Sequence, residues 1–304
     1  MTDILYELSI EINTEDFNKC FIKRNCKSLT KISPDEYADY SYIDQGLLFI
    51  FRNSKYKKKV KVIASLYGMG NQNDINSEQF IHKLKKKICK YFDDEYHLND
   101  FVCSAVSLIR DTDLESDKNV ASYINVVRRI GKVKKYHSIS CIDNLPKNSF
   151  CLSGNSNGIL LLLYAPDDIS SADSCGVLRT EIRLNKNFIK NTTEHICTSK
   201  QIEDIIIQSN SLFKKIYFSI VPPGNYYKKR KAIDIINHEI DDVRLRRKMI
   251  KLVTLVSEKK SLLLAQKTMN TRGMCKIMNA FKIIGLSPIT ISKREKAQYL
   301  KNIY

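Results

Sequence analysis

The stretch VLRTEIRL at residues 177–184 has the sharpest alternation in the chain and decides the fold class. Successive side chains of a β-strand point to opposite faces of its sheet. One face would therefore carry Val177, Arg179, Glu181 and Arg183, and the other Leu178, Thr180, Ile182 and Leu184. The pattern predicts a strand with one charged face and one largely apolar face.

Apolar runs on both sides of this stretch predict further strands at residues 4–12, 47–51, 60–66, 101–109, 149–152, 159–164 and 216–221. Two of them, 47–51 and 60–66, are expected to pair as a hairpin with a charged connection. None of these runs is long enough to indicate a membrane span.

Helical spacing of apolar residues predicts helices over residues 77–92, 117–130 and 199–207. Ser77 is the expected N-cap of the first, and Asp117 or Asn119 is expected to begin the second. Because these helices and strands do not alternate strictly, residues 1–222 are predicted to be α+β, with helices packed on a largely antiparallel sheet.

The positive charge is concentrated towards the end of the sequence. The whole chain has 50 Lys and Arg against 33 Asp and Glu, a net charge of +17. Residues 223–304 alone have 19 Lys and Arg against 6 Asp and Glu, a net charge of +13. Turn residues at 222–225 predict a boundary there, between a domain of residues 1–222 and a basic domain of residues 223–304. So concentrated a charge favours a polyanion, and DNA is the expected partner, single-stranded or as an origin duplex.

Several other classes are disfavoured. The N-terminus lacks the pattern of a signal peptide, and no basic amphipathic helix carries exposed aromatics for a membrane surface. The nine cysteines are odd in number and include no C-x2-C pair, which favours reduced thiols over a zinc site. We therefore expect a cytoplasmic protein with no membrane partner.

The basic segment is predicted to be all-α and to resemble a helix-turn-helix. Acids at 241–242 favour a helix start, followed by an apolar stripe of Leu245, Met249, Leu252, Val253 and Val256. Ala265 supplies the small residue that crossing helices need, residues 270–273 the turn, and Cys275 and Met278 the apolar positions of the second helix. Met269 stands where the tightest turn would have glycine, so an ordinary basic helical bundle is the alternative.

Both alternatives predict contacts with DNA phosphates from this segment. The expected DNA-binding residues are Arg246, Arg247, Lys248, Lys267, Arg272, Lys276, Asn279 and Lys282. Only the helix-turn-helix predicts that bases are read, and Arg272 and Asn279 are the side chains suited to it.

Charged residues in the first domain could form a site that cleaves a phosphodiester. Asp111, Asp113 and Glu181 could bind Mg²⁺ or Mn²⁺, which would polarise a phosphate. Tyr164 could attack that phosphate and stay joined to a DNA 5′ end, while Arg179 and Arg183 hold its oxygens. The alternative is a ladder of salt bridges on a solvated sheet face, with Tyr164 at the edge of the core.

Residues 149–189 resemble the core of rolling-circle replication initiation proteins of filamentous phages and Gram-positive plasmids. The resemblance is carried by the turn GNSNG at 154–158, the strand ending at Tyr164, and LRTEIRL at 178–184. IRDTD at 109–113 is similar to the acidic strand of that family, and GLSPITI at 285–291 to its closing segment. The resemblance implies a nicking and joining enzyme of a phage, plasmid or mobile element, with a tyrosine nucleophile and a divalent metal ion.

Several alternatives remain open beside this one. Pro166 stands where the family motif has lysine, which favours a non-catalytic DNA-binding regulator or accessory protein with the same fold. Tyr123 and Tyr136 are alternative nucleophiles. The aromatic pair Tyr226 and Tyr227 beside basic residues is a weaker indication of an RNA-binding module. A homodimer is a further expectation.

Overall fold

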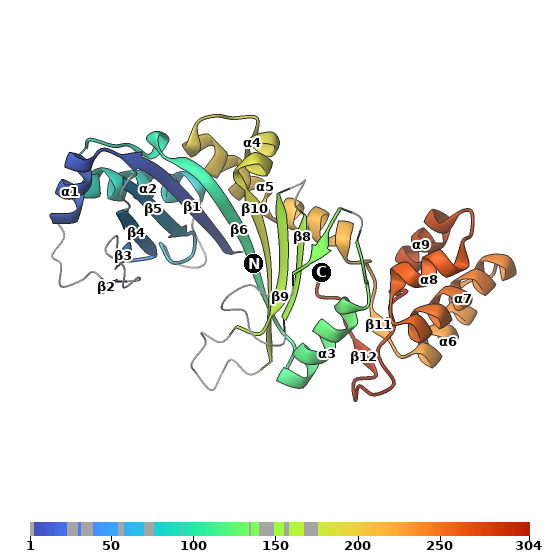
Figure 1. The fold of residues 1–304 in the computed structure, drawn as a ribbon. Coiled ribbons are helices and arrows are strands. Elements are labelled where there is room, and N and C mark those ends of the chain that lie inside the picture. The colour runs from blue at the N-terminus through green and yellow to red at the C-terminus, as the bar shows by residue number, and fades with distance from the viewer. Residues whose placement is uncertain are drawn as a thin grey trace. The chain divides into compact units, whose positions relative to one another are not determined.

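The computed structural model of the chain describes residues 3–22, 30–31, 39–53, 58–69, 76–92, 94–133, 135–139, 149–154, 158–166 and 176–304. They form two compact units, one of residues 1–110 and 183–212, the other of residues 111–182 and 213–304 (Figure 1). Residues 213–222 thus share a unit with the basic segment. The predicted functional division after residue 222 stays a prediction.

The strands within the described residues are β1 (Asp3–Ile12), β2 (Thr30–Lys31), β3 (Asp39–Asp44), β4 (Leu47–Asn53), β5 (Lys58–Ser65), β6 (Val102–Asp113), β7 (His137–Ser138), β8 (Ser149–Gly154), β9 (Ile159–Tyr164), β10 (Val177–Asn185), β11 (Tyr226–Tyr227) and β12 (Tyr299–Leu300). Ten of them join in the order β2-β3-β4-β5-β1-β6-β10-β9-β8-β7, while β11 pairs with β12. The predicted α+β class with a large antiparallel sheet is confirmed.

The helices are α1 (Thr14–Ile22), α2 (Ser77–Phe92), α3 (Asp117–Arg128), α4 (Lys186–Thr193), α5 (Thr198–Ile220), α6 (Lys229–Glu239), α7 (Val243–Lys259), α8 (Leu262–Met269) and α9 (Met274–Ile283). β6, β10 and α5 contribute residues to both units.

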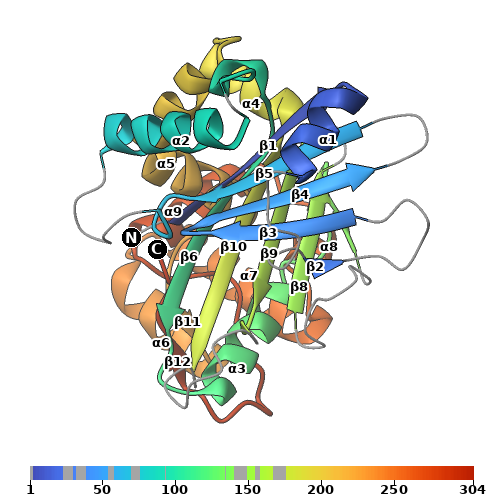
Figure 2. The same cartoon turned by 90° about the vertical axis from the view of Figure 1, so that its left-hand side faces the viewer.

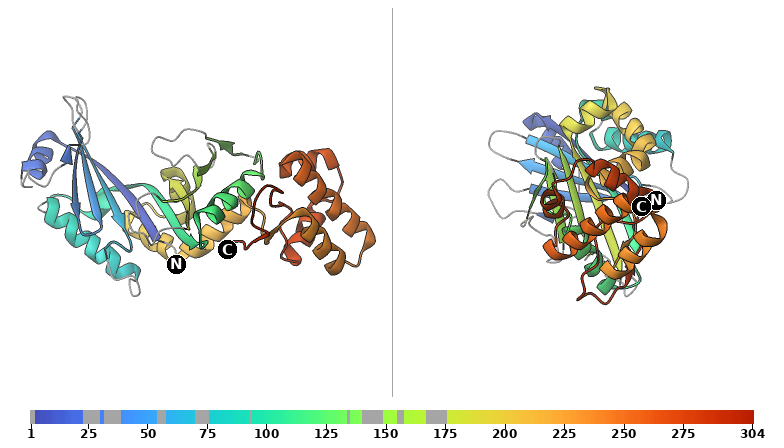
Figure 3. Two further views of the ribbon diagram at one scale, coloured as in Figure 1. Left: turned by 90° about the horizontal axis from the view of Figure 1, so that it is seen from below. Right: turned by 90° about the vertical axis from the view of Figure 1, so that its right-hand side faces the viewer.

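In the first unit the strands β3, β4, β5 and β1 lie side by side (Figure 2), and β4 and β5 form the predicted hairpin. α2 runs along this part of the sheet (Figure 3, left) and packs aromatic rings against it. The ring of Phe80 lies 5.6 Å from that of Tyr6, and the ring of Tyr91 lies 4.8 Å from that of Phe49. Burial of these rings accounts for the position of the helix.

α2 and α3 begin at the predicted residues, Ser77 and Asp117, but each is capped by the residue before it. Asn76, and not Ser77, caps α2, because its Oδ1 accepts the backbone N–H of Gln79 at 2.8 Å. Ser116 caps α3 in the same way, with its Oγ accepting the N–H of Asn119. In both cases a residue just upstream offers the oxygen at the better position.

The alternation predicted for residues 177–184 is confirmed in β10. Leu178, Thr180, Ile182 and Leu184 are fully buried, whereas the side chains between them are partly exposed. In the second unit β9 pairs with β8, so that Cys151 lies opposite Leu162.

The strand predicted at residues 216–221 is wrong, because these residues end the long helix α5. Phe213, Tyr217 and Ile220 recur at helical spacing along α5 and are all buried. A short apolar run fits a strand and a buried helix equally well, and here the helix is continuous from Thr198.

The four helices α6–α9 gather in one group within the second unit (Figure 1). α7 starts beside the acids at 241–242, as predicted, and Asp242 is its N-cap. The stripe of α7 is buried at Met249, Leu252, Val253 and Val256, with Leu245 partly exposed. Ala265 is buried and residues 270–273 form the turn between α8 and α9, as predicted. The apolar position assigned to Cys275 is wrong: Cys275 is exposed, and Ile277, Ala280 and Phe281 form the buried face of α9.

No helix within the described ranges combines the length and the hydropathy that a membrane span needs.

Candidate functional site

Tyr164 and Glu181 meet in the second unit, where β9 ends beside β10. The hydroxyl of Tyr164 donates a hydrogen bond to Glu181 Oε2 at 3.2 Å. Burial raises the pKa of Tyr164 to about 12; the charge of Glu181 raises it as well, and that of Arg179 acts in the opposite direction. Tyr164 is therefore a neutral phenol at pH 7, with a carboxylate in place to accept its proton.

Arg179 lies on the same face of β10 and binds Asp111 on β6. Its Nε and Nη2 donate to the two carboxylate oxygens of Asp111 at 2.8 and 2.7 Å. This bidentate pair raises the pKa of Arg179, which stays charged. Tyr164, Arg179, Glu181 and Asp111 thus form a polar cluster on one face of the sheet.

Two predicted site residues lie outside this cluster. Arg183 lies in the first unit and binds Glu7 Oε1 at 2.7 Å, while Lys61 binds the other oxygen of Glu7 at 2.5 Å. Asp113 accepts the backbone N–H of Glu115 at 2.7 Å, so it stabilises its own turn.

A divalent ion does not fit these residues as they stand. No three Asp, Glu, His or Cys side chains in the described part of the chain come together as a metal ion would require. Both oxygens of Asp111 are bound by Arg179, and one oxygen of Glu181 is bound by Tyr164. Asp167 and Asp168 lie outside the described residues. Mg²⁺ or Mn²⁺ stays a prediction.

The two alternative tyrosines differ in accessibility. Tyr123 is fully buried in α3, with its hydroxyl 3.1 Å from that of Tyr217, and burial raises its pKa. A phosphate cannot reach that hydroxyl in the folded chain. Tyr136 is partly exposed.

The predicted DNA-binding residues all lie at the surface. Arg247, Lys248, Lys267, Arg272, Lys276, Asn279 and Lys282 are exposed, and Arg246 is partly exposed with Nη1 donating to the carbonyl of Asn237 at 3.3 Å. No Lys or Arg between residues 228 and 282 forms an ion pair with an acidic side chain of the described residues. The positive side chains of this surface are therefore left without a salt-bridge partner among the described residues.

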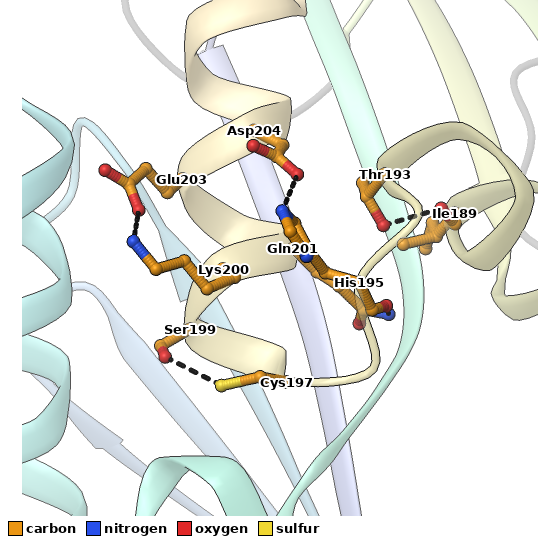
Figure 4. Close-up of polar contacts among 9 residues, drawn as sticks. All are labelled: Ile189, Thr193, His195, Cys197, Ser199, Lys200, Gln201, Glu203 and Asp204. Carbon is orange, nitrogen blue, oxygen red and sulfur yellow. Dashed lines mark hydrogen bonds and ion pairs between the residues drawn. The ribbon is translucent and has the colours of Figure 1, made fainter.

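A second polar cluster, at the start of α5 in the first unit, was missed by the sequence analysis (Figure 4). The thiol of Cys197 lies 3.2 Å from Ser199 Oγ and 3.1 Å from Asn99 Oδ1. The hydrogen bond with Ser199 lowers the pKa of Cys197, backbone N–H groups at the helix start add to this, and burial opposes it. A cysteine directly before a helix start is the sequence signal that could have indicated it.

The remaining contacts in Figure 4 are structural. His195 Nε2 lies 3.5 Å from Asp204 Oδ2, Lys200 pairs with Glu203 at 2.8 Å, and Gln201 donates to the carbonyl of His195 at 2.6 Å. The contacts of His195 hold the turn that leads into α5, whereas Lys200 and Glu203 pair within the helix.

No protein-family model and no curated protein matches the sequence. Among solved structures, the chain is similar to a rolling circle replication initiator protein from Geobacillus stearothermophilus, with 10% identity over 72% of this chain and 86% of that one and a TM-score of 0.39. It is also similar to the di-domain ARO/CYC StfQ of the steffimycin biosynthetic pathway, with 8% identity over 71% of this chain and 96% of that one and a TM-score of 0.23. At such scores neither likeness bears on function.

Proposed function

We propose that this protein is a DNA-binding protein of the replication-initiator kind, and that the surface of α6–α9 contacts the DNA. The observation that carries the proposal is the exposed positive charge of these helices, which forms no salt bridge within the described residues. Phosphates attract such a surface because binding releases their condensed counterions.

The geometry of α8 and α9 supports contact with a groove. Asn270 and Gly273 adopt positive φ angles of 39° and 85°, which turn the chain sharply between the two helices. Arg272, Lys276 and Asn279 then follow at the exposed side of α9 and its leading turn. Arginine and asparagine are the side chains that read guanine and adenine in the major groove.

The test is the salt dependence of duplex binding, measured by fluorescence anisotropy. The double variant Lys276→Gln/Lys282→Gln should lower the slope of log Kd against log salt by about 2, since each phosphate contact contributes about 0.9. The matched control Lys186→Gln/Lys190→Gln removes the same charge from exposed positions of α4 in the first unit. Equal slopes for the two double variants, or a wild-type slope near zero, would overturn the proposal.

A second proposal is that Tyr164 nicks one DNA strand, and it rests on the hydrogen bond between Tyr164 and Glu181. In this reaction the phenol oxygen attacks phosphorus, the bond from phosphorus to the 3′ oxygen breaks, and Glu181 takes the phenol proton. The released 3′ oxygen takes a proton from water, and the DNA 5′ end stays on the tyrosine. Arg179, on the same face of β10 as Glu181, binds a phosphate oxygen in this reaction, after exchange of its bond with Asp111.

This second proposal predicts a covalent adduct with single-stranded origin DNA, seen as a shifted band after denaturing electrophoresis. Incubation with Mn²⁺, with Mg²⁺ and with EDTA also tests the predicted ion. Tyr164→Phe should abolish the adduct and Tyr123→Phe should leave it unchanged. An adduct that survives in Tyr164→Phe would assign the nucleophile elsewhere, with Tyr136 as the next residue to replace. The homodimer stays a prediction, which sedimentation velocity on the same protein would test.

A further inference from the structure

A cleft of about 730 Å³ lies within the second unit. Its walls are the end of α3, the start of α6, the end of α7 and the turn at residues 292–295. The volume is within the range of small-molecule sites, which is roughly 300–1,000 Å³. None of the predicted DNA-binding residues lines it.

The cleft is strongly positive. Five cations line it, namely Arg129, Lys229, Lys260, Lys293 and Arg294. Two acids, Glu258 and Glu295, also line it. None of the five cations forms an ion pair with a carboxylate of the described residues. Positive charge gathered in a concave site raises the local concentration of anions.

One of the two acids has a structural role. Glu295 accepts the hydroxyl of Ser122 at 2.7 Å on Oε2 and the amide of Asn125 at 3.2 Å on Oε1. Both donors belong to α3, so Glu295 attaches the turn 292–295, and with it Lys293 and Arg294, to that helix. The positive side chains of the turn are therefore held at the cleft.

Arg129 is the best-placed ligand group of the cleft. Its side chain is partly buried, and one donor, Nη1, binds the carbonyl of Thr290 at 2.7 Å. Its backbone carbonyl accepts the N–H of Leu262 at 2.8 Å, which fixes the end of α3 against the start of α8. Burial lowers the pKa of Arg129 and Glu295 opposes this, so an anion in the cleft would stabilise the charged guanidinium further.

We propose that this cleft binds the phosphate group of a nucleotide, either free or within a nucleic-acid strand. A guanidinium binds two phosphate oxygens with parallel hydrogen bonds, and lysines add compact positive charges around them. The proposal goes beyond DNA binding by α6–α9, because the side chains that line the cleft are not the ones proposed to contact DNA.

Isothermal titration calorimetry on the full chain tests the proposal with four probes: pyrophosphate, thymidine 5′-monophosphate, 5′-phosphorylated trithymidylate and thymidine. The three phosphate compounds should bind and thymidine should not. Equal affinities for pyrophosphate and thymidine 5′-monophosphate would show that the phosphate alone supplies the binding energy. Tighter binding of the trinucleotide would indicate that the cleft binds a nucleic-acid strand. No binding of any phosphate compound, or equal binding of thymidine, overturns the proposal.

Variants connect the binding to the cleft. Lys293→Gln/Arg294→Gln changes two exposed side chains of a turn and should weaken phosphate binding about tenfold or more, as expected for charged hydrogen bonds. Arg129→Gln should weaken it at least as much, with a thermal unfolding curve to check the fold. Arg272→Gln/Lys276→Gln should leave it unchanged. If the cleft variants do not change phosphate binding, the inference is overturned, even where duplex binding is intact. If duplex binding alone is lost, the inference stands.

Discussion

Arg179 donates to both carboxylate oxygens of Asp111, from Nε at 2.8 Å and from Nη2 at 2.7 Å. The pair connects β10 to β6 within the second unit and occupies the acid that would otherwise be the first choice as a metal ligand. Within the polar cluster around Tyr164, Arg179 thus balances the charge of Asp111.

The pair should contribute little to stability, because both side chains are partly exposed, 24% for Arg179 and 39% for Asp111. We expect a coupling energy of about 1 kcal/mol or less between Arg179→Gln and Asp111→Asn. Urea unfolding of the two single variants and the double variant measures it. A coupling of several kcal/mol would mean that the pair mainly stabilises the fold.

The pKa of Tyr164 should respond in opposite directions to its two charged neighbours. Glu181→Gln removes a negative charge and should lower the pKa from about 12, whereas Arg179→Gln removes a positive charge and should raise it. A titration followed by the ¹³Cζ signal of labelled tyrosine measures both shifts, and Tyr164→Phe identifies the signal. Shifts in the same direction in both variants would contradict the geometry of the cluster.

Stability should depend on pH through Asp44 in the first unit. Burial raises the pKa of Asp44, but hydrogen bonds from Tyr91 at 2.6 Å and Lys87 at 3.0 Å outweigh it, so the pKa falls below its ordinary value of 3.8. A lowered pKa in the folded state adds stability above the unfolded pKa, and this is lost as the pH falls through the folded pKa.

Asp44→Asn should therefore cost about 1 kcal/mol at pH 7, with a smaller difference from the wild type below pH 3.8. Unfolding by urea at pH 7 and pH 3 compares the two proteins. Tyr91→Phe keeps the carboxylate and should show a weaker dependence on pH. A difference between wild type and Asp44→Asn that grows on acidification would reverse the expected sign.

Cys197 should be alkylated faster at neutral pH than the buried cysteines. Its pKa is lowered, whereas burial raises the pKa of Cys103 to about 12 and of Cys151 to about 11. Only the thiolate reacts with iodoacetamide, so the rate follows the pKa and the exposure of each thiol. Peptide mass spectrometry after short exposure measures the rates, and Ser199→Ala should slow the reaction at Cys197.

Cys275 is the matched reference for that experiment, because it is exposed and lies in α9. At pH values below 8, Cys197 should react faster than Cys275 despite being less exposed. Equal or slower reaction at Cys197 would show that the hydrogen bonds at the start of α5 do not favour its thiolate.

The sequence was sufficient for features that depend on local pattern. Three such features were predicted correctly: the alternation of residues 177–184, the hairpin of β4 and β5, and the start of α7 beside the acids at 241–242. The end of α5 was not, because Ile216 and its apolar neighbours fit a strand or a buried helix until tertiary packing decides between them.

The site was predicted in its residue types but only partly in its pairings. The sequence placed Arg179, Glu181 and Arg183 on one face and Tyr164 at the end of another strand. It could not indicate that Asp111 would bind Arg179 or that Arg183 would bind Glu7. Those partners come from strands far apart in the chain, and their register depends on the whole sheet. The cleft beside Arg129 could not be predicted from the sequence for the same reason, because four separate segments line it.

Gly131, two residues after Arg129, lies in close contact with the start of α8. Gly131 has a φ of +75°, and a Cβ at this position would lie 2.2 Å from Ser261 Oγ. Ser261 is the N-cap of α8 and is itself buried, so it cannot move without loss of the cap. Gly285 is a matched control, because it has a φ of +62° with nothing within 4 Å of its added Cβ.

Gly285→Ala should cost about 1 kcal/mol, from the backbone angle alone. Gly131→Ala should cost about 1–3 kcal/mol more, because the clash adds to the same backbone term and displaces the cap of α8. Urea unfolding measures both values. Since Arg129 lies two residues before Gly131, the affinity for pyrophosphate should also fall in Gly131→Ala and stay unchanged in Gly285→Ala. Equal costs for the two substitutions would show that the end of α3 and the start of α8 are not in close contact in solution.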